Sequence, residues 1–429
     1  MSKGFFTADQ TTVKVDIAKK ATGCGACGLY KHCLSPKMDT AGKGRKGILL
    51  VLEAPGGRED RVGKPLVGRS RRTVTRVLER MGLDLDLDLW RTNANICRPE
   101  KNKTPTDQQI AYCRPRLFKE IKRLKPRGII VMGLPALKSV IQHRWIGDKM
   151  GVNAIKRWRG FTIPDQDLGC WLCPTWHPAY VNRSEKDPSV QLLFEMDLEN
   201  AVRTILETPF PKYGDEAKRI RQIMNPNLLD QELERIHLQS PFFVFDWETT
   251  GIRPYAKGHR IVSCSICTPD LDVIAFPMPR HKSRRVHLRR LLSDWSVGKG
   301  AHNMGFEHLW AGHDLKTIVQ GWQWDSQLAA HIIDNRSYIT SLKFQTYVNF
   351  GVIDYDSHMG TWLHSSPQDV KKYGANAKNK IFKLVQEKDG WNTLLTYNGL
   401  DSIYEMMLAR KQMELIGVDH FASTNSASI

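Results

Sequence analysis

Carboxylates in three separate segments are the residues best suited to chemistry in the second half of the chain. Asp246 and Glu248 form a D-x-E pair in FDWETTG, so both side chains project from one face of the expected strand. Glu307 follows in AHNMGFE, and Asp401 follows in YNGLDSIYE, four residues after Tyr397. Because residues four apart share one face of a helix, Tyr397 and Asp401 can address the same site.

This arrangement predicts a site for two divalent cations, Mg²⁺ or Mn²⁺, about 3.5–4 Å apart, with all four acidic residues as metal ligands. In such a site one cation activates a water and the other steadies a leaving 3′ oxygen, while the Tyr397 hydroxyl orients the water. A D-x-E pair alone is more often a solvated acidic pair, so the prediction depends on all three segments. Asp325, between an expected strand and helix, is expected to support the site without binding the metal.

A second group with chemical potential consists of thiols near the start of the chain. Cys24 and Cys27 form C-x-x-C, and Cys97 and Cys113 frame a stretch further on. Four thiolates can hold either a zinc ion or a [4Fe–4S] cluster, and the spacing alone does not choose between them. Cys33 lies close to the first pair and is an alternative ligand.

Two further C-x-x-C pairs lie in apolar runs typical of strands: Cys170 with Cys173, and Cys264 with Cys267. A strand turns residues three apart to opposite faces, so the two thiols of a pair cannot easily bind one ion. We therefore expect these four cysteines to be core residues.

The elements that must position these residues fall into two groups. In the first half, short apolar strands such as GILLVLEAPG alternate with helical patterns such as SRRTVTRVLERMG, which predicts a mostly parallel sheet covered on both faces. A polar, helix-prone stretch precedes a new apolar strand at FFVFDWETTG. The expected organisation is an N-terminal domain over 1–205, a linker over 206–239, a second α/β domain over 240–415 and a flexible tail over 416–429.

The formal net charge of +18, concentrated in the first half, favours a polyanionic partner such as nucleic acid over a generally basic solvated surface. The N-terminal residues lack the apolar run of a secretory signal, and no apolar run approaches the roughly 20 residues of a membrane span. A cytoplasmic location, in a bacterial or phage-infected cell, is the expectation. Membrane proteins are excluded.

Five motifs, in order, resemble the iron–sulfur uracil-DNA glycosylases of family 4. They are CGAC, LEAPGGRED, GKPLVG, TNANICRPEKNKTPT and PTWHPAYVNR. The resemblance covers the first 205 or so residues and implies a three-layer α/β/α sandwich. It also implies a [4Fe–4S] cluster rather than zinc, held by Cys24, Cys27, Cys97 and Cys113.

The same resemblance implies a uracil-binding site. Asn93 offers both a donor and an acceptor to a base edge, and His177 would stabilise charge on the departing base oxygen. Glu53 and Glu59 would support an oxocarbenium-like sugar or orient water. The competing interpretations are that Asn93 caps a loop and that Glu53 pairs with an arginine.

The chain departs from the glycosylase pattern where the base would lie. Leu66 replaces a phenylalanine that stacks on the base, and Leu52 replaces a glycine. Loss of a stacking platform costs about 1–3 kcal/mol of base binding. An alternative hypothesis therefore keeps the fold as a DNA- or polymerase-binding module without uracil excision. A structural role with both sites silent is a third.

The acidic segments resemble the tyrosine-containing DEDD exonucleases found as proofreading domains of family A DNA polymerases. The local matches are FDWETTG, AHNMGFE, WDSQLAAHIID and YNGLDSIYE, and Glu307 stands where the family has aspartate. The resemblance implies an RNase H-like fold and metal-dependent 3′→5′ digestion of DNA. Some bacteriophage polymerases join such domains to a polymerase, so a separate polymerase partner is expected here. Single-stranded 3′ ends and uracil-containing DNA are the expected substrates.

Overall fold

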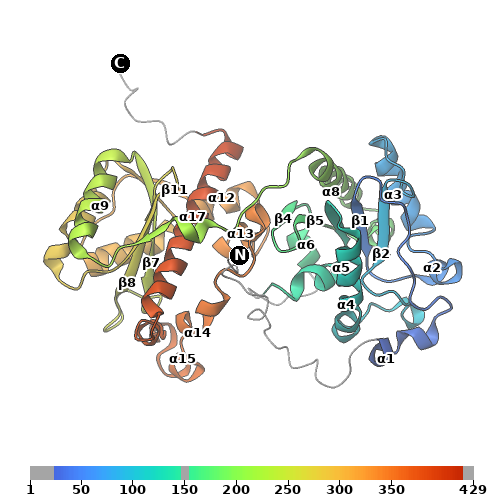
Figure 1. Cartoon of the computed structure of the whole chain (residues 1–429), viewed down its shortest axis with the longest axis horizontal. Coiled ribbons are helices and arrows are strands. Elements are labelled where there is room, and N and C mark those ends of the chain that lie inside the picture. The colour runs from blue at the N-terminus through green and yellow to red at the C-terminus, as the bar shows by residue number, and fades with distance from the viewer. Residues whose placement is uncertain (1–23, 146–153, 419–429) are drawn as a thin grey trace, which may run out of the picture. The chain divides into compact units, whose positions relative to one another are not determined.

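The computed structural model describes residues 24–145 and 154–418, which form two compact units. The first unit comprises the described residues up to Thr162 together with Gly169–Phe210. The second comprises Ile163–Leu168, which include strand β4 (Ile163–Asp165), and the described residues from Pro211 onward. Figure 1 shows the helices and strands of each unit.

The first unit is built on parallel strands in the order β2-β1-β3-β5. Their bounds are β1 (Ile48–Leu52), β2 (Leu89–Asn93), β3 (Gly128–Met132) and β5 (Cys170–Thr175). All five residues of β1, ILLVL, are buried, as expected for a parallel strand covered on both faces. The carboxyl ends of these strands therefore meet at one edge of the sheet.

Helices cover both faces of this sheet, giving the predicted three layers. Val74, Val77 and Leu78 recur at helical spacing on α3 and pack with α8 against Leu50 of β1. Leu49 points to the opposite face and is also fully buried. The helices are α1 (Cys24–Cys27), α2 (Gly57–Val62), α3 (Arg69–Arg80), α4 (Asp107–Leu124), α5 (Leu134–Leu137), α6 (Ala154–Trp158), α7 (Pro178–Arg183) and α8 (Pro188–Glu207).

The second unit contains a mixed sheet in the order β11-β10-β7-β8-β9-β6. Its strands are β6 (Ile220–Gln222), β7 (Phe242–Thr249), β8 (Ile261–Cys267), β9 (Val273–Pro277), β10 (Gly298–Ala301) and β11 (Trp322–Asp325). Strands β7, β8 and β9 form an antiparallel meander, and β10 and β11 continue beside β7 in parallel. This is the predicted RNase H-like arrangement, so the α/β class is confirmed for both units.

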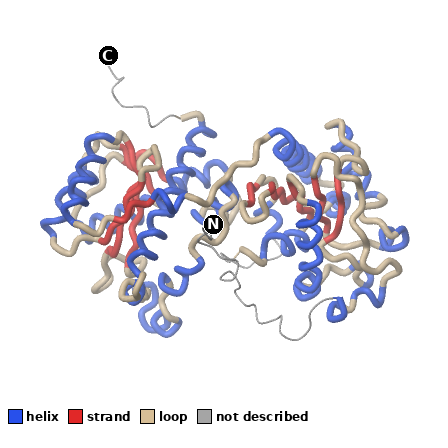
Figure 2. Tube along the Cα trace, viewed as in Figure 1, coloured by secondary structure: helices blue, strands red, loops and turns tan. Residues whose placement is uncertain are grey.

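Helices flank the second sheet as well (Figure 2). The long helix α17 (Gly390–Ile416) packs on β7, β8 and β9, while α9 (Pro226–Gln239) and α10 (Val286–Ser293) contribute to the core on the other face. The remaining helices are α11 (Met304–Trp310), α12 (Ser326–Ile333), α13 (Leu342–Phe350), α14 (Gly360–Leu363), α15 (Pro367–Tyr373) and α16 (Ile381–Leu384).

The stretch expected as a linker over 206–239 differs from that expectation in the structure. Strand β6 pairs with β9, and Leu229, Leu233 and Ile236 of α9 are buried in the second unit's core. These apolar residues recur at helical spacing within polar sequence, which is the pattern of a packed surface helix. Only the first residues of the stretch belong to α8, and most of the expected tail, 419–429, lies outside the described residues.

The cysteines predicted to be core residues are buried in strands. Cys170 and Cys173 lie on β5, and Cys264 and Cys267 lie on β8. Cys264 faces the core formed with α9 and α10, whereas Cys267 faces the core formed with α17, as the alternation of a strand requires. None of the described helices is long and apolar enough to cross a membrane.

Candidate functional sites

Four cysteines from three parts of the first unit line one small pocket. Cys24 and Cys27 lie on α1, Cys97 follows β2 and Cys113 lies on α4, which packs against α1. The apolar side chain of Leu29 also lines the pocket. Residues 89 positions apart in sequence are thus brought together, and all are free thiols.

The chemistry of this pocket fits a thiolate-bound metal group. Burial raises the pKa of Cys97 to about 12, so its thiol is protonated unless a cation displaces the proton. The Cys97 sulfur already accepts a hydrogen bond from the Lys37 backbone N–H at 3.2 Å, as cluster-binding thiolates commonly do. Cys33 packs beside Cys97 but does not line the pocket. The four predicted ligands therefore fit the group better than a set that includes Cys33.

A polar pocket of about 260 Å³ opens at the carboxyl edge of the first sheet. Glu53 directly follows β1, Asn93 ends β2 and His177 follows β5, and Glu59 of α2 completes the set. Parallel strands present their carboxyl ends at one edge, which is where such sheets bind ligands. We call this the strand-end pocket. It contains the four residues predicted from the motifs.

His177 is held as a neutral ring with a defined tautomer. Burial, with a smaller contribution from the Arg183 charge, lowers the pKa of His177 to about 4. Its Nδ1 accepts the Ala179 backbone N–H at 3.2 Å, so the ring proton must be on Nε2. His177 is therefore a neutral donor. Asn93 is 3% exposed, and its side chain makes no hydrogen bond within the described part of the chain, so it does not cap a loop.

Glu53 and Glu59 differ in their surroundings. Burial raises the pKa of Glu53 to about 7, against the lowering effect of the Arg183 charge. Glu53 is therefore partly protonated at neutral pH. Glu59 Oε1 accepts the Val67 backbone N–H at 3.0 Å, which ties α2 to the loop that carries Leu66. The backbone contact gives Glu59 a positioning role in the glycosylase-like loop.

In the second unit, Asp246, Glu248 and Asp401 converge. One oxygen from each of these carboxylates lies within 4.8 Å of the other two. Asp246 and Glu248 are separated by one residue on β7, and Asp401 is brought to them by α17. Glu307 is not part of this close group, but it is buried at the N-terminal end of α11, and the Asp246 charge acts on it.

Neighbouring polar groups orient these carboxylates. Asn398 Nδ2 donates to Asp246 Oδ2 at 2.7 Å, and the Tyr355 hydroxyl donates to Asp401 Oδ1 at 2.6 Å. Tyr397 also hydrogen-bonds with Asp401, and this contact helps to lower the pKa of that carboxyl group. Each acid therefore retains oxygens that are free to bind a cation. We call Asp246, Glu248, Glu307 and Asp401 the carboxylate centre.

Without a cation, the acids of the carboxylate centre favour their protonated forms. Burial, followed by the charges of neighbouring acids, raises the pKa values of Asp246 and Glu248 well above their ordinary range. Burial also raises the pKa of Asp401 to about 6, although Tyr355, Tyr397 and the Lys343 charge oppose the shift. Divalent cations would displace these protons, so the donor set of hard oxygens fits Mg²⁺ or Mn²⁺.

Comparison with known proteins identifies the family of the first unit. The Uracil DNA glycosylase superfamily matches residues 41–199. A type-4 uracil-DNA glycosylase from Pyrobaculum aerophilum is 34% identical over 182 residues, which cover 41% of this chain and 86% of that protein. The chain belongs to the uracil-DNA glycosylase superfamily. Within the first unit, which we now call the glycosylase unit, the match includes the strand-end pocket and two of the four clustered cysteines.

One relative extends beyond the glycosylase unit. A DNA polymerase of Bacillus phage SP01 is 25% identical over 332 residues, which cover 70% of this chain but only 34% of that protein. Among solved structures, RNase D from Trypanosoma brucei is 15% identical and covers 47% of this chain and 66% of that chain, with a TM-score of 0.34. A likeness this slight carries no conclusion about the second unit, so its function is argued from its own geometry.

The two departures from the glycosylase motifs both line the strand-end pocket. Leu52 ends β1, and Leu66 has a backbone φ of 54°, in the left-handed region that few residues other than glycine adopt. Leu66 is 3% exposed and packs into the core of the glycosylase unit. The pocket therefore has an aliphatic wall where an aromatic one was expected.

Several residues near the sites were not predicted from sequence. Arg183 lines the strand-end pocket and acts on both Glu53 and His177. Arg183 ends the motif PTWHPAYVNR and lies at the end of α7, so the motif could have indicated it. Asn398 directly follows Tyr397 in YNGLDSIYE, so that motif could have indicated it as well. Tyr355 belongs to no motif, so only the fold reveals its contact with Asp401.

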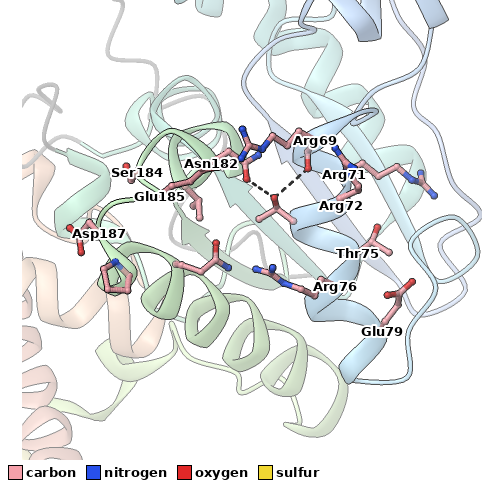
Figure 3. A pocket seen from close by; sticks show the side chains of 14 residues that line it. Arg69, Arg71, Arg72, Thr75, Arg76, Glu79, Asn182, Ser184, Glu185 and Asp187 are labelled. Atoms are coloured by element: carbon pink, nitrogen blue, oxygen red, sulfur yellow. Dashed lines mark hydrogen bonds and ion pairs between the residues drawn. The ribbon is translucent and has the colours of Figure 1, made fainter.

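A groove rich in arginine lies between α3 and the α7–α8 segment of the glycosylase unit (Figure 3). Its volume is about 750 Å³. Arg69 pairs with Glu185, and Arg71 pairs with Asp86. Arg72 is exposed and forms no ion pair within the described residues, so its guanidinium is available to an anion. The remaining lining residues include Arg76, Glu79, Asn182, Ser184 and Asp187.

Proposed function

We propose that this chain is a DNA replication or repair enzyme with two catalytic centres. The second unit is a metal-dependent 3′→5′ exonuclease of the proofreading type, and the glycosylase unit excises uracil from DNA. The observation that carries the proposal is the convergence of Asp246, Glu248 and Asp401 within 4.8 Å, with Tyr397 beside them. The superfamily membership of the first unit supports the second activity.

Uracil excision needs a donor where charge develops on the leaving base. A neutral His177 with its proton on Nε2 meets this need, because the Nε2–H can donate a hydrogen bond to the oxygen on which negative charge develops. The Asn93 amide would read the uracil edge with one donor and one acceptor. Ionised Glu53 would balance the positive charge that grows on the sugar as the bond to the base breaks.

Exonuclease chemistry would use the carboxylate centre. Divalent cations, when bound, supply positive charge to the attacking and leaving oxygens. Asp246, Glu248, Glu307 and Asp401 would hold them, and the Tyr397 hydroxyl would orient the water that attacks the terminal phosphodiester. Asn398 and Tyr355 would keep Asp246 and Asp401 in the required rotamers through their hydrogen bonds.

The nuclease proposal is tested with a labelled single-stranded oligonucleotide. The wild-type protein with Mg²⁺ should shorten it stepwise from the 3′ end, and Asp246→Ala or a chelator should abolish the shortening. Chelator-resistant digestion, or digestion by Asp246→Ala at the wild-type rate, would remove the assignment. A 5′-blocked and a 3′-blocked substrate establish the direction.

The glycosylase proposal is tested with a uracil-containing oligonucleotide followed by alkaline cleavage, in a chelator concentration that stops the nuclease. Cleavage by wild type but not by Asn93→Ala supports excision. The second candidate function, in which this unit binds DNA or a polymerase without excision, is favoured by the aliphatic wall of Leu52 and Leu66. No abasic product from wild type would select that alternative.

The cysteine pocket is proposed to hold a [4Fe–4S] cluster. The four thiols and their apolar enclosure support a thiolate-bound group, and the resemblance of the five motifs to iron–sulfur glycosylases favours a [4Fe–4S] cluster over zinc. A brown protein that absorbs near 400 nm and loses this colour in Cys97→Ala is the expected result. A polymerase partner is also proposed, because the match to a DNA polymerase of Bacillus phage SP01 extends beyond the glycosylase unit.

A further inference from the structure

Another groove lies in the second unit, at the same end of β7 as the carboxylate centre. It opens where β8 begins and β9 ends, and its volume is about 580 Å³. Strand β8 runs antiparallel to β7, so its first residues lie beside the last residues of β7: Ile261 pairs with Thr249, and Ser263 pairs with Glu248. We call this the β8–β9 groove. Neither the nuclease motifs nor the proposed function gives it a role.

A bulge connects the β8–β9 groove to the surroundings of the carboxylate centre. The pairing of β7 with β8 shifts between Glu248 and Thr249 and skips Val262. Such a bulge changes the direction in which a side chain points. Val262 lines the groove and belongs to the buried cluster that also contains Tyr397. Because Tyr397 hydrogen-bonds with Asp401, the groove and the carboxylate centre share one cluster of packed side chains.

The charge of the groove is positive. Among the described residues that line it, the ionisable ones are Arg260, Arg280 and Arg285, and none is an aspartate or a glutamate. Arg285 is paired with Asp314 at 3.4 Å. Arg260 and Arg280 are exposed and form no ion pair within the described part of the chain, so two guanidinium groups are available to an anion. Arg260 precedes Ser263, the partner of Glu248, by three residues, which is about 10 Å along a strand.

Aromatic and apolar side chains complete the walls of the groove. Phe382 and Trp391 are half-buried, and Met224 is 56% exposed. The guanidinium carbon of Arg260 lies 4.2 Å from the centroid of the Phe382 ring, so the cation stacks on an aromatic face. Surfaces that bind single-stranded nucleic acid combine the same two features: positive groups meet the phosphates, and aromatic rings stack on the bases.

An apolar protein segment fits this groove less well than a nucleic acid strand. Such a segment would cover Arg260 and Arg280 without supplying a counter-charge, and burying an unpaired charge is costly. A single strand supplies a negative phosphate at each nucleotide together with a base that can stack. The carboxylate centre has no positive charge of its own, so a strand that reaches it must be held by positive groups nearby.

We propose that the β8–β9 groove binds single-stranded DNA next to the nucleotide that the carboxylate centre removes. Arg260 and Arg280 contact phosphates of the strand, and Phe382 and Trp391 stack on its bases. The inference rests on the proposed nuclease function and adds a path for the strand. Because the 3′ end lies at the carboxylates, the groove holds nucleotides on the 5′ side of that end.

The first experiment is a fluorescence-anisotropy titration of a single-stranded oligonucleotide with the full chain, in chelator so that no nucleotide is removed. A variant with both Arg260→Ala and Arg280→Ala should bind about ten-fold more weakly at low salt. Its slope of log affinity against log salt should fall by about 1–2, because two phosphate contacts are lost. Arg284→Ala is the matched control and should bind like wild type, because Arg284 is exposed but pairs with Asp230 and does not line the groove.

Photo-crosslinking locates the strand without any change to the protein. An oligonucleotide that carries 5-iodocytosine near its 3′ end is irradiated with the wild-type chain in chelator, and the crosslinked peptide is identified by mass spectrometry. The expected peptide contains Phe382 or Trp391. Phe382→Leu keeps an apolar side chain, removes the ring and should abolish a crosslink at position 382. Thermal unfolding checks that each variant is folded.

Crosslinks confined to other surfaces would overturn the proposal, as would an unchanged affinity and salt slope in the double arginine variant. The nuclease assignment fails separately. If the strand crosslinks to the groove but wild type with Mg²⁺ does not shorten it, the proposed function is wrong while the groove remains a site for single-stranded DNA. If wild type shortens the strand but never crosslinks there, the nuclease stands and the inference about the groove is wrong.

Discussion

Buried titratable side chains dominate both sites at the scale of the residue. In the strand-end pocket, the same desolvation acts in opposite senses on two groups: it lowers the pKa of His177 and raises that of Glu53. His177 is therefore neutral throughout the physiological range, and Glu53 titrates within it. Burial disfavours the charged form of both side chains. The pocket therefore holds a neutral donor, His177, together with an ionisable acid, Glu53.

Glu53 predicts a pH dependence of stability. Its pKa is about 7 in the folded protein, above its ordinary value of 4.5, so the unfolded chain releases the proton first as pH rises. The free energy of unfolding should fall between pH 4.5 and 7 and then level off. In Glu53→Gln this part of the fall should disappear, so the variant should gain melting temperature over wild type from pH 5 to pH 8. A difference in melting temperature that does not change with pH would contradict the raised pKa of Glu53.

At the scale of the element, the position of Glu307 depends on a helix start. Asp325 ends β11 and caps α12, because its Oδ1 accepts the backbone N–H groups of Gln327 and Leu328. The same carboxylate accepts the backbone N–H groups of Asn303 and Met304, where α11 begins. One side chain therefore joins two helix starts, and α11 carries Glu307 towards Asp246.

Asp325→Ala should lower both stability and cation affinity. Loss of the cap and of the contacts to α11 should cost about 1–3 kcal/mol, since backbone donors lose their acceptor. Weaker Mn²⁺ binding should accompany this loss, because α11 no longer holds Glu307 in place. Urea unfolding and calorimetry measure the two effects. Asp325→Asn keeps an acceptor oxygen, so its stability and Mn²⁺ affinity should lie between those of wild type and Asp325→Ala. An alanine variant with wild-type Mn²⁺ affinity would contradict the positioning role.

At the scale of the whole molecule, basic and acidic groups are divided unevenly between the two units. The chain carries a net charge of +18, yet the carboxylate centre consists of acidic groups and offers no positive charge of its own to a DNA phosphate. Attraction to DNA must therefore come from basic surfaces elsewhere, and the arginine groove on the glycosylase unit is one of them.

The groove predicts a salt-dependent contribution to DNA binding. Arg72→Ala should weaken binding to single-stranded DNA and reduce the slope of log affinity against log salt by about 1, because one phosphate contact is lost. Fluorescence anisotropy over a salt series measures the slope. Arg80→Ala is the control on the same helix, since Arg80 is already paired with Glu195 and Glu199. Equal slopes for wild type and Arg72→Ala would show that the groove does not contact phosphate.

The sequence alone predicted the α/β class, which the structure confirms, and it proposed the four cysteines and the residues of both sites, because short motifs record local geometry. D-x-E sets two carboxylates on one face of a strand, and Y-x-x-x-D sets two groups on one face of a helix. It did not determine which of those groups meet, since the distance between segments depends on packing. Only the tertiary structure brought Tyr355 to Asp401 and gave α9 to the second core instead of a linker. Such contacts join segments far apart in the chain, and no local pattern encodes them.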